Sequence, residues 1–183
     1  MHTSSRPCRR VIPGGAPLTR IFPLAPMSGL ILGLTVMLWA VPIVFFAGHY
    51  VAPLPGLAPV GGLMVTIYAW VWLWWRPSRF EVGPTGLTAV FPLRRRQTEW
   101  HAIEKVERID ADELKRRYGR LLRVGAGGLW GGFGWLWAPG GTWVEFYISS
   151  MHGYVLIERS GMRPLLITPD RPDEFVALLN SRR

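Results

Sequence analysis

Three side chains near the middle of the chain have the types and spacing of a metal or acid–base site. They are Glu99, His101 and Glu104. On a β-strand Glu99 and His101 would point to the same side, and a histidine with a carboxylate is a common pair of metal ligands. The other histidines fall in distant parts of the sequence, so further ligands are missing. We therefore expect no metal site, no catalytic residue and no cofactor.

Two groups of basic residues have the charge to contact anionic lipid headgroups. The groups are Arg94, Arg95 and Arg96, and Lys115, Arg116 and Arg117. Each Lys or Arg close to an anionic membrane surface contributes about 1 kcal/mol to binding. The alternative is that both groups form a solvated rim that nearby glutamates partly neutralise. Only the first interpretation gives these residues a function.

A segment rich in glycine and tryptophan, 124–144, contains eight glycines, four tryptophans and no charged residue. Three interpretations compete. The segment is a loop whose aromatic side chains Trp130, Trp135 and Trp137 enter the membrane interface, a structured loop over the mouth of a barrel, or a third membrane span. Glycine costs nearly 1 kcal/mol relative to alanine in a helix, which argues against the span.

The element that must position these groups is the stretch 21–75, which contains no Asp, Glu, Lys or Arg. A membrane-spanning helix needs about 20 apolar residues. The stretches 27–47 and 57–75 each supply that length, and the prolines and glycine between them break a continuous helix. We predict a two-helix transmembrane hairpin at 21–75, preceded by a flexible cytoplasmic tail at 1–20.

The distribution of charge orients this hairpin. Four arginines precede it, Arg76 and Arg79 follow it, and the connection between the two spans has no charge. Positive residues remain on the cytoplasmic side, so we expect a multi-pass protein of the cell inner membrane with both termini in the cytoplasm. The formal net charge of +9 fits a domain held against anionic lipid. Nucleic acid is not an expected partner, because no zinc spacing, helix-turn-helix pattern or RNP-like strand is present.

The pattern of the remaining residues, 76–183, predicts a mainly-β domain. Short alternating segments predict strands at 80–82, 87–93, 105–109, 142–150, 154–159 and 164–168. In 142–150, Val144, Phe146 and Ile148 face one way and Trp143, Glu145 and Tyr147 the other, as in a half-buried antiparallel strand. A short helix is expected at 111–118. A C-terminal helix begins after Asp170 and places its apolar face over the sheet.

The order of these elements resembles the bacterial pleckstrin-homology-like (PH-like) domains that follow a pair of membrane spans. The likeness covers about 78–181 and is carried by the segments 80–87, 153–158 and 166–176, with the pattern Thr-Pro-x-x-Pro-x-x-Phe leading into the last helix. The resemblance implies a small bent β-sandwich or split barrel closed by a C-terminal helix. It also implies a binding or scaffolding role without catalysis. The first hairpin turn, 83–86, lacks the basic residues of lipid-binding pleckstrin domains.

The sequence leads to two functional hypotheses, which belong to different classes of protein. The first is a membrane-anchored interaction or scaffold module that presents a PH-like domain at the inner face of a bacterial membrane and touches anionic lipid. Its partners would be membrane lipids and another membrane or cytoplasmic protein. The alternative is an accessory subunit or enzyme of a membrane complex that uses 124–144 as a lid. That alternative requires at least two buried titratable side chains facing the segment.

Overall fold

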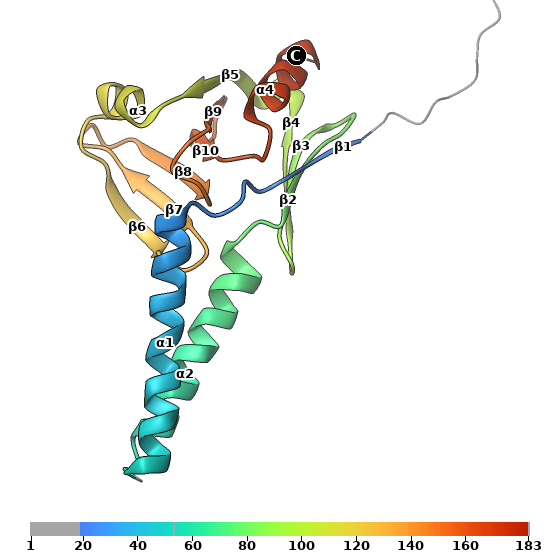
Figure 1. Cartoon of the computed structure of the whole chain (residues 1–183). Helices are drawn as coiled ribbons and strands as arrows, with labels where there is room; N and C mark the ends of the chain where they lie inside the picture. The colour runs from blue at the N-terminus through green and yellow to red at the C-terminus, as the bar shows by residue number, and fades with distance from the viewer. Residues whose placement is uncertain (1–18, 53, 183) are drawn as a thin grey trace, which may run out of the picture.

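A stem of two helices joins a domain of two β-sheets in the computed structural model, which describes residues 19–52 and 54–182 (Figure 1). The strands are β1 Arg20–Pro23, β2 Arg79–Val82, β3 Gly86–Val90, β4 Arg95–Glu99, β5 Ile103–Ile109, β6 Leu122–Gly127, β7 Gly132–Trp137, β8 Trp143–Ile148, β9 Tyr154–Arg159 and β10 Leu165–Ile167. The helices are α1 Gly29–Val51, α2 Leu57–Trp70, the π-helical turn η1 Val71–Trp75, the 3₁₀ turn η2 Trp100–Ala102, α3 Ala111–Tyr118 and α4 Pro172–Arg182.

The stem consists of α1 and of α2 continued by η1. With 23 and 19 residues, the two segments are long and apolar enough to cross a membrane, by length and composition. They pack against each other through Gly61, where an added Cβ would lie 3.2 Å from the ring of Phe46. The Tyr68 hydroxyl donates a hydrogen bond to the Leu38 carbonyl over 3.0 Å. The predicted second span matches the structure, whereas the first runs over Gly29–Val51 instead of 27–47.

The start of the stretch 21–75 is a strand and not part of the helical hairpin. β1 pairs antiparallel with β2, with Arg20 opposite Val82 and Pro23 opposite Arg79. The strand forms because Phe22 is fully buried and packs edge-to-face on Phe175 of α4, with the ring centroids 5.1 Å apart. The stem is therefore inserted between two neighbouring strands of one sheet. Most of the predicted tail, 1–18, lies outside the described residues.

Two sheets form the rest of the domain. One is antiparallel in the order β1-β2-β3-β4, and the other has the order β5-β9-β10-β8-β7-β6 with a parallel pair between β10 and β8. Apolar side chains from both sheets form one core, and α4 packs against it through Phe175 and Leu179. This architecture agrees with the predicted combination of apolar helices, a mainly-β domain and a C-terminal helix.

Strand β8 is buried on both faces apart from the half-buried Trp143, so the expectation of a half-buried strand at 142–150 was wrong in part. The alternation itself is present. Val144, Phe146 and Ile148 belong to an outer cluster that includes Leu114 of α3, while Tyr147 belongs to the core between the sheets. Because α3 covers part of the outer face, both sets of alternating side chains are removed from water.

The segment 124–144 contains two paired strands, so neither a third span nor an irregular loop describes it. β6 and β7 form an antiparallel hairpin, and β7 also pairs with β8. Glycine fits here because the strands approach closely. At Gly134, whose φ is +135°, an added Cβ would lie 2.5 Å from the Val124 carbonyl oxygen. Strand pairing satisfies the backbone groups that a glycine-rich loop would expose.

Candidate functional site

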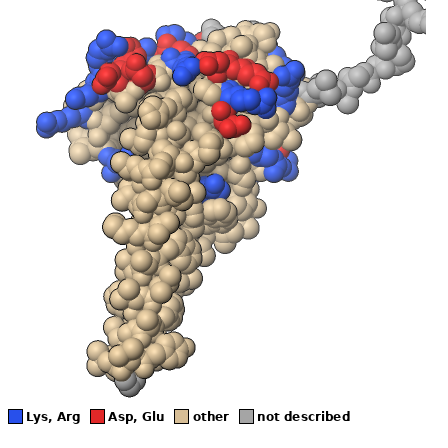
Figure 2. Space-filling model, in the orientation of Figure 1, with Lys and Arg blue, Asp and Glu red and all other residues tan. Residues whose placement is uncertain are grey.

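Charged side chains are concentrated away from the stem. In the face shown by Figure 2, most Lys, Arg, Asp and Glu side chains gather over the part of the sheet domain farthest from the helices, some Lys or Arg side chains lie close to the stem, and the stem itself shows none. Two hairpin turns, β3–β4 and β6–β7, lie on the side of the domain from which the helices leave (Figure 1). This side of the molecule contains most of the tryptophan contacts described below.

The β6–β7 turn is fixed to the first helix by Thr35. The Thr35 hydroxyl oxygen accepts a hydrogen bond from the Trp130 backbone N–H over 2.9 Å and lies 3.0 Å from the Gly128 carbonyl oxygen. Trp130 adopts a left-handed backbone conformation, with φ of +58°. A bulky residue takes this conformation only where its surroundings enforce it. The turn and α1 therefore form one interlocked unit.

Tryptophans of the sheet domain meet tryptophans of the stem. The Trp130 ring lies 4.7 Å from Trp72 and 6.3 Å from Trp39, between ring centroids. The Trp135 ring lies 5.0 Å from Trp75, edge to face. Trp137 lies at the other end of β7 from the turn, opposite Trp143. Of the three predicted interface aromatics, Trp130 and Trp135 are thus joined at the stem, and Trp137 is not with them.

Two arginines with unusual surroundings flank the end of α2. The guanidinium carbon of Arg76 lies 4.3 Å from the Trp72 ring centroid. That of Arg94 lies 4.5 Å from Phe91 and 5.6 Å from Trp74. The Nε atoms of both arginines are buried and have no hydrogen-bond partner among the described residues. Burial lowers the pKa of both side chains from the usual value for arginine.

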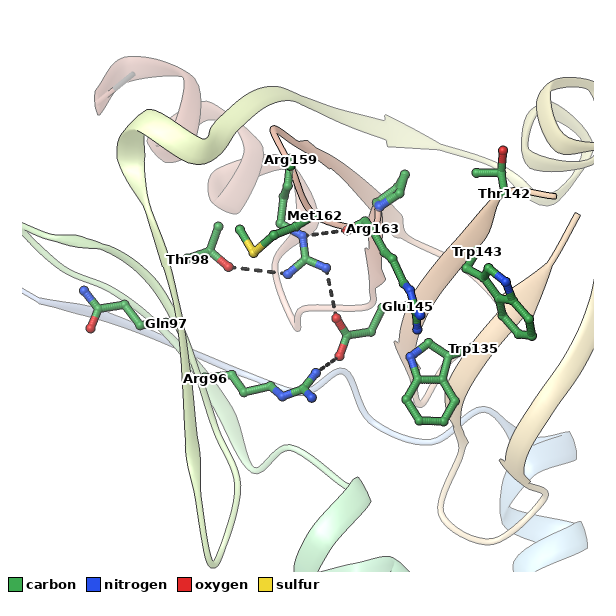
Figure 3. A pocket seen from close by; sticks show the side chains of 12 residues that line it. Arg96, Gln97, Thr98, Trp135, Thr142, Trp143, Glu145, Arg159, Met162 and Arg163 are labelled. Atoms are coloured by element: carbon green, nitrogen blue, oxygen red, sulfur yellow. Dashed lines mark hydrogen bonds and ion pairs between the residues drawn. The ribbon is translucent and has the colours of Figure 1, made fainter. Parts of the chain in front are cut away.

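The first predicted lipid-binding group is divided by the structure. Arg94 lies beside the stem, and Arg95 begins β4; both line a hollow of about 570 Å³ at the β3–β4 turn. Leu93, at this turn, is 60% exposed. Arg96 points to the space between the sheets and forms an ion pair with Glu145 (Figure 3). Only Arg94 and Arg95 therefore remain near the stem end of the domain.

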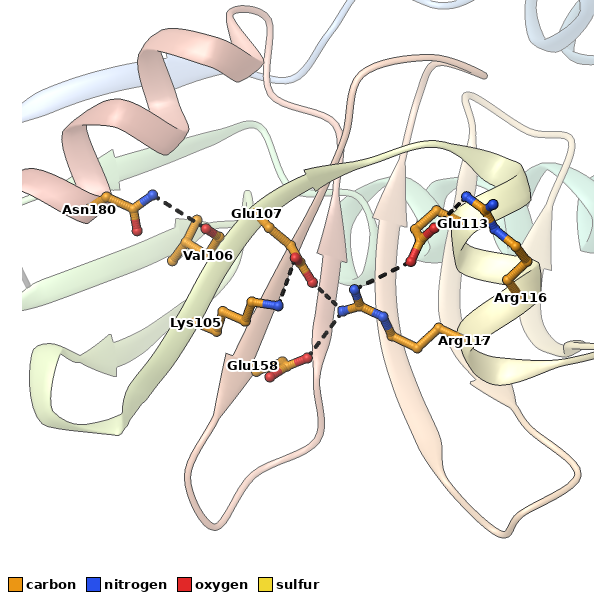
Figure 4. Close-up of polar contacts among 8 residues, drawn as sticks. All are labelled: Lys105, Val106, Glu107, Glu113, Arg116, Arg117, Glu158 and Asn180. Carbon is orange, nitrogen blue, oxygen red and sulfur yellow. Dashed lines mark hydrogen bonds and ion pairs between the residues drawn. The ribbon is translucent and has the colours of Figure 1, made fainter.

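The second predicted lipid-binding group lies on α3, on the far side of the domain from the stem (Figure 1). Arg116 forms an ion pair with Glu113. Arg117 forms ion pairs with Glu107 and, over 3.3 Å, with Glu158 (Figure 4). A hydrogen bond from Arg117 is the largest influence on Glu107 and lowers its pKa. Lys115 is exposed on the same helix.

The three residues weighed as a metal or acid–base site, Glu99, His101 and Glu104, include one close pair at the surface. His101 Nδ1 lies 3.2 Å from a Glu99 carboxylate oxygen, and both side chains are exposed. His101 lies in η2, so strand alternation does not apply to it. Within residues 19–52 and 54–182, no group of three or more His, Cys, Asp or Glu side chains could hold a metal ion.

A cluster of charged side chains that our sequence analysis did not single out lies between the sheets. Glu145 of β8, 7% exposed, accepts hydrogen bonds from Arg159, over 2.9 Å, and from the Tyr147 hydroxyl. It also forms the ion pair with Arg96, which crosses from one sheet to the other. Arg159 also donates to the Arg163 carbonyl oxygen over 2.8 Å. The cluster therefore links β4, β8 and β9 (Figure 3).

The protonation of this cluster follows from burial and hydrogen bonding. Burial alone would raise the pKa of Glu145, but the hydrogen bonds from Tyr147 and Arg159 and the positive charge of Arg96 outweigh it, so the pKa is lowered. Burial, with the adjacent Glu145 charge, raises the pKa of Tyr147. Glu145 is therefore an anion and Tyr147 a neutral donor at neutral pH.

A cavity of about 790 Å³ adjoins this cluster. Its lining includes Arg96, Glu145 and Arg159, together with Trp135 and Trp143 (Figure 3). The alternation at 142–150 placed Trp143, Glu145 and Tyr147 on one face, but this pattern alone did not indicate that the second sheet would cover that face. Both oxygens of Glu145 are engaged by donors, so this carboxylate is held as an ion pair and is not free to act as a base.

Comparisons with protein-family models, with curated proteins and with solved structures found no match to this chain. The resemblance to bacterial PH-like domains therefore stays a prediction.

Proposed function

We propose that this chain is a membrane-anchored interaction module, with α1 and α2 crossing the bilayer and the sheet domain resting on its cytoplasmic face. The observation that carries this proposal is the insertion of two apolar helices between β1 and β2. β1 pairs with β2 residue by residue, so both ends of the stem must lie on the same side of a membrane. A hairpin that crosses the bilayer twice meets this requirement.

The proposed orientation of the stem in the membrane follows from the charged residues around it. The connection between the helices contains no charged residue, whereas Arg20, Arg76 and Arg79 flank the stem. By the positive-inside rule these arginines stay in the cytoplasm. We therefore propose a multi-pass protein of the cell inner membrane with both termini inside.

Orientation can be tested by labelling single cysteines in a Cys8→Ser background. In intact cells, a thiol reagent that does not cross membranes is expected to label Leu54→Cys in the connection and to spare Ser160→Cys in the exposed β9–β10 turn. After the cells are opened, both positions should react. The reverse pattern would refute the proposed orientation.

The proposed role is binding without catalysis. The two-sheet architecture with α4 packed on its core supports the resemblance to bacterial PH-like domains, which implies binding or scaffolding. The partners would be membrane lipids and another membrane or cytoplasmic protein.

We assign lipid contact to the stem end of the domain. Arg76 and Arg94 lie over tryptophan rings there, and tryptophan prefers the headgroup level of a bilayer. Both side chains are half-buried, and a guanidinium group offers further donors that fit a phosphate oxygen. Lys115, Arg116 and Arg117 are left out of this contact, because α3 lies on the far side of the domain from the stem (Figure 1).

Lipid contact predicts a stability difference between two bilayers. The full chain should melt at a higher temperature in nanodiscs containing phosphatidylglycerol than in phosphatidylcholine alone, since a ligand that binds only the folded state raises its stability. Replacing both Arg76 and Arg94 with glutamine should remove most of this difference, about 1 kcal/mol per charge.

The matched control removes the same charge from α3, in Lys115→Gln with Arg116→Gln. This variant should keep the full response to phosphatidylglycerol. A loss of the response in the α3 variant alone, or no response in the unmodified chain, would contradict the assignment.

One observation favours the alternative of an accessory subunit or enzyme in a membrane complex. The buried Glu145 and Arg159 line the same cavity as Trp135 and Trp143 of 124–144, which supplies one buried titratable group, Glu145, where two are required, because arginine stays protonated. The segment is paired in the sheet, so it does not act as a lid.

A further inference from the structure

The cavity between the two sheets has a composition that selects a ligand. Its rim and walls carry the guanidinium groups of Arg96, Arg159 and Arg163, the carboxylate of Glu145, and two indole rings. We propose that it binds a small organic anion, a carboxylate or phosphate joined to a flat apolar group.

The charge of the cavity favours an anion. Three arginines against one glutamate leave a formal excess of two positive charges among the lining residues. Both oxygens of Glu145 are already engaged, one by Arg96 and Tyr147 and the other by Arg159. Its charge is thus balanced within the protein, and the excess positive charge remains for a ligand.

Arg163 is the group best placed to bind this anion. Its guanidinium carbon lies 5.9 Å from the Trp135 ring centroid and 5.7 Å from that of Trp143. It is exposed, and it forms no ion pair with a carboxylate of the described residues. A guanidinium group offers two parallel donors that fit a carboxylate or phosphate. Arg96, whose side chain is 46% exposed, supplies a second cation on the opposite wall.

The two tryptophans define the apolar part of the ligand. Trp135 and Trp143 come from adjacent strands and both line the cavity beside Arg163 (Figure 3). A flat group seated among these rings gains contact area and ring–ring attraction. The volume of about 790 Å³ lies in the range of ~300–1,000 Å³ typical of small-molecule sites.

Matched probes test both halves of the proposal. The full chain, held in phosphatidylcholine nanodiscs, is titrated calorimetrically with phenyl phosphate, inorganic phosphate and phenol. Phenyl phosphate is expected to bind at least about tenfold more tightly than either fragment, because only it meets both the arginines and the rings. Arg163→Gln should lower the affinity for phenyl phosphate about tenfold. Trp143→Leu should lower it to the affinity for inorganic phosphate.

The control is Arg120→Gln, which removes an equal charge from an exposed site outside the cavity and should leave all three affinities unchanged. Melting temperatures verify that each variant is folded. Absence of saturable phenyl phosphate binding up to about 10 mM, or equal weakening by Arg120→Gln and Arg163→Gln, would overturn the proposal.

Bilayer composition then distinguishes two sources of the ligand. If the phosphate of a lipid headgroup occupies the arginine part of the cavity, phosphatidylglycerol nanodiscs will weaken phenyl phosphate binding by competition, and Arg163→Gln will abolish that difference. Equal affinity in both bilayers identifies the ligand as a soluble anion.

Discussion

Replacing Glu145 with alanine is expected to lower the free energy of unfolding of the sheet domain by about 3–5 kcal/mol. The side chain of Arg159 is only 8% exposed and would lose the carboxylate that neutralises it. Removing one partner of a buried ion pair leaves an uncompensated charge, which costs more than the pair itself contributes. Arg96 is more exposed and can turn to water, so Arg159 dominates the loss.

This effect can be measured by guanidinium titration of the full chain in neutral detergent, followed by tryptophan fluorescence. Changing Glu145 to leucine together with Arg159 to methionine removes both buried charges and should recover most of the lost stability, since hydrophobic replacement of a buried pair is often neutral. A single Glu145→Ala variant within 1 kcal/mol of the unmodified chain would show that the cluster does not hold the sheets together.

Acidification gives an independent check on the same carboxylate. Because the pKa of Glu145 is lowered on folding from its usual value of 4.5, its stabilising contribution is present above pH 4.5 and is lost as the pH falls below it. The unmodified chain should therefore lose more stability between pH 5 and 3 than Glu145→Gln does. If the free energy of unfolding fell equally with pH in the two proteins, the lowered pKa of Glu145 would be contradicted.

Replacing Phe175 with alanine is the second change expected to have a large effect, a loss of about 3–5 kcal/mol. Phe175 has 0% exposure, and its ring packs on Phe22 of β1 and Phe80 of β2. The substitution would leave a cavity at the point where α4, β1 and β2 meet. Since β1 precedes the stem, the loss of this contact would also loosen the attachment of the stem to the domain.

The control for this prediction is Leu178→Ala on the same helix, which is only partly buried against the core and should cost clearly less. Thermal melting of the full chain in detergent distinguishes the two variants. If both variants have the same melting temperature as the unmodified chain, α4 does not close the core.

Features encoded by local patterns were predicted from the sequence. The absence of charge over 21–75 indicated two apolar helices, and the alternation at 142–150 indicated the strand β8. The C-terminal helix followed from Pro172, Phe175 and Leu179, which give a first-turn proline and an apolar face.

Features that depend on distant partners were missed. β1 continues into an apolar run without a charge to mark its end, and its partner β2 begins only at Arg79. β6 and β7 are rich in glycine, which has low strand propensity, and they form because β8 supplies an edge. Glu145 and Arg159 meet although β10 lies between their strands β8 and β9, an order that no local pattern specifies.

The register of β1 and β2 also determines where a short connector could replace the stem. Pro23 and Arg79 stand opposite each other at the point where the chain leaves the sheet and returns to it. A tight connector between them would keep the edge strand β1 paired with β2, but it would also remove Thr35, which holds the β6–β7 turn, and Trp75, which packs on Trp135. Removing the N-terminal part of the chain up to the end of the stem would instead discard β1. It would expose the edge of β2, a surface prone to aggregation.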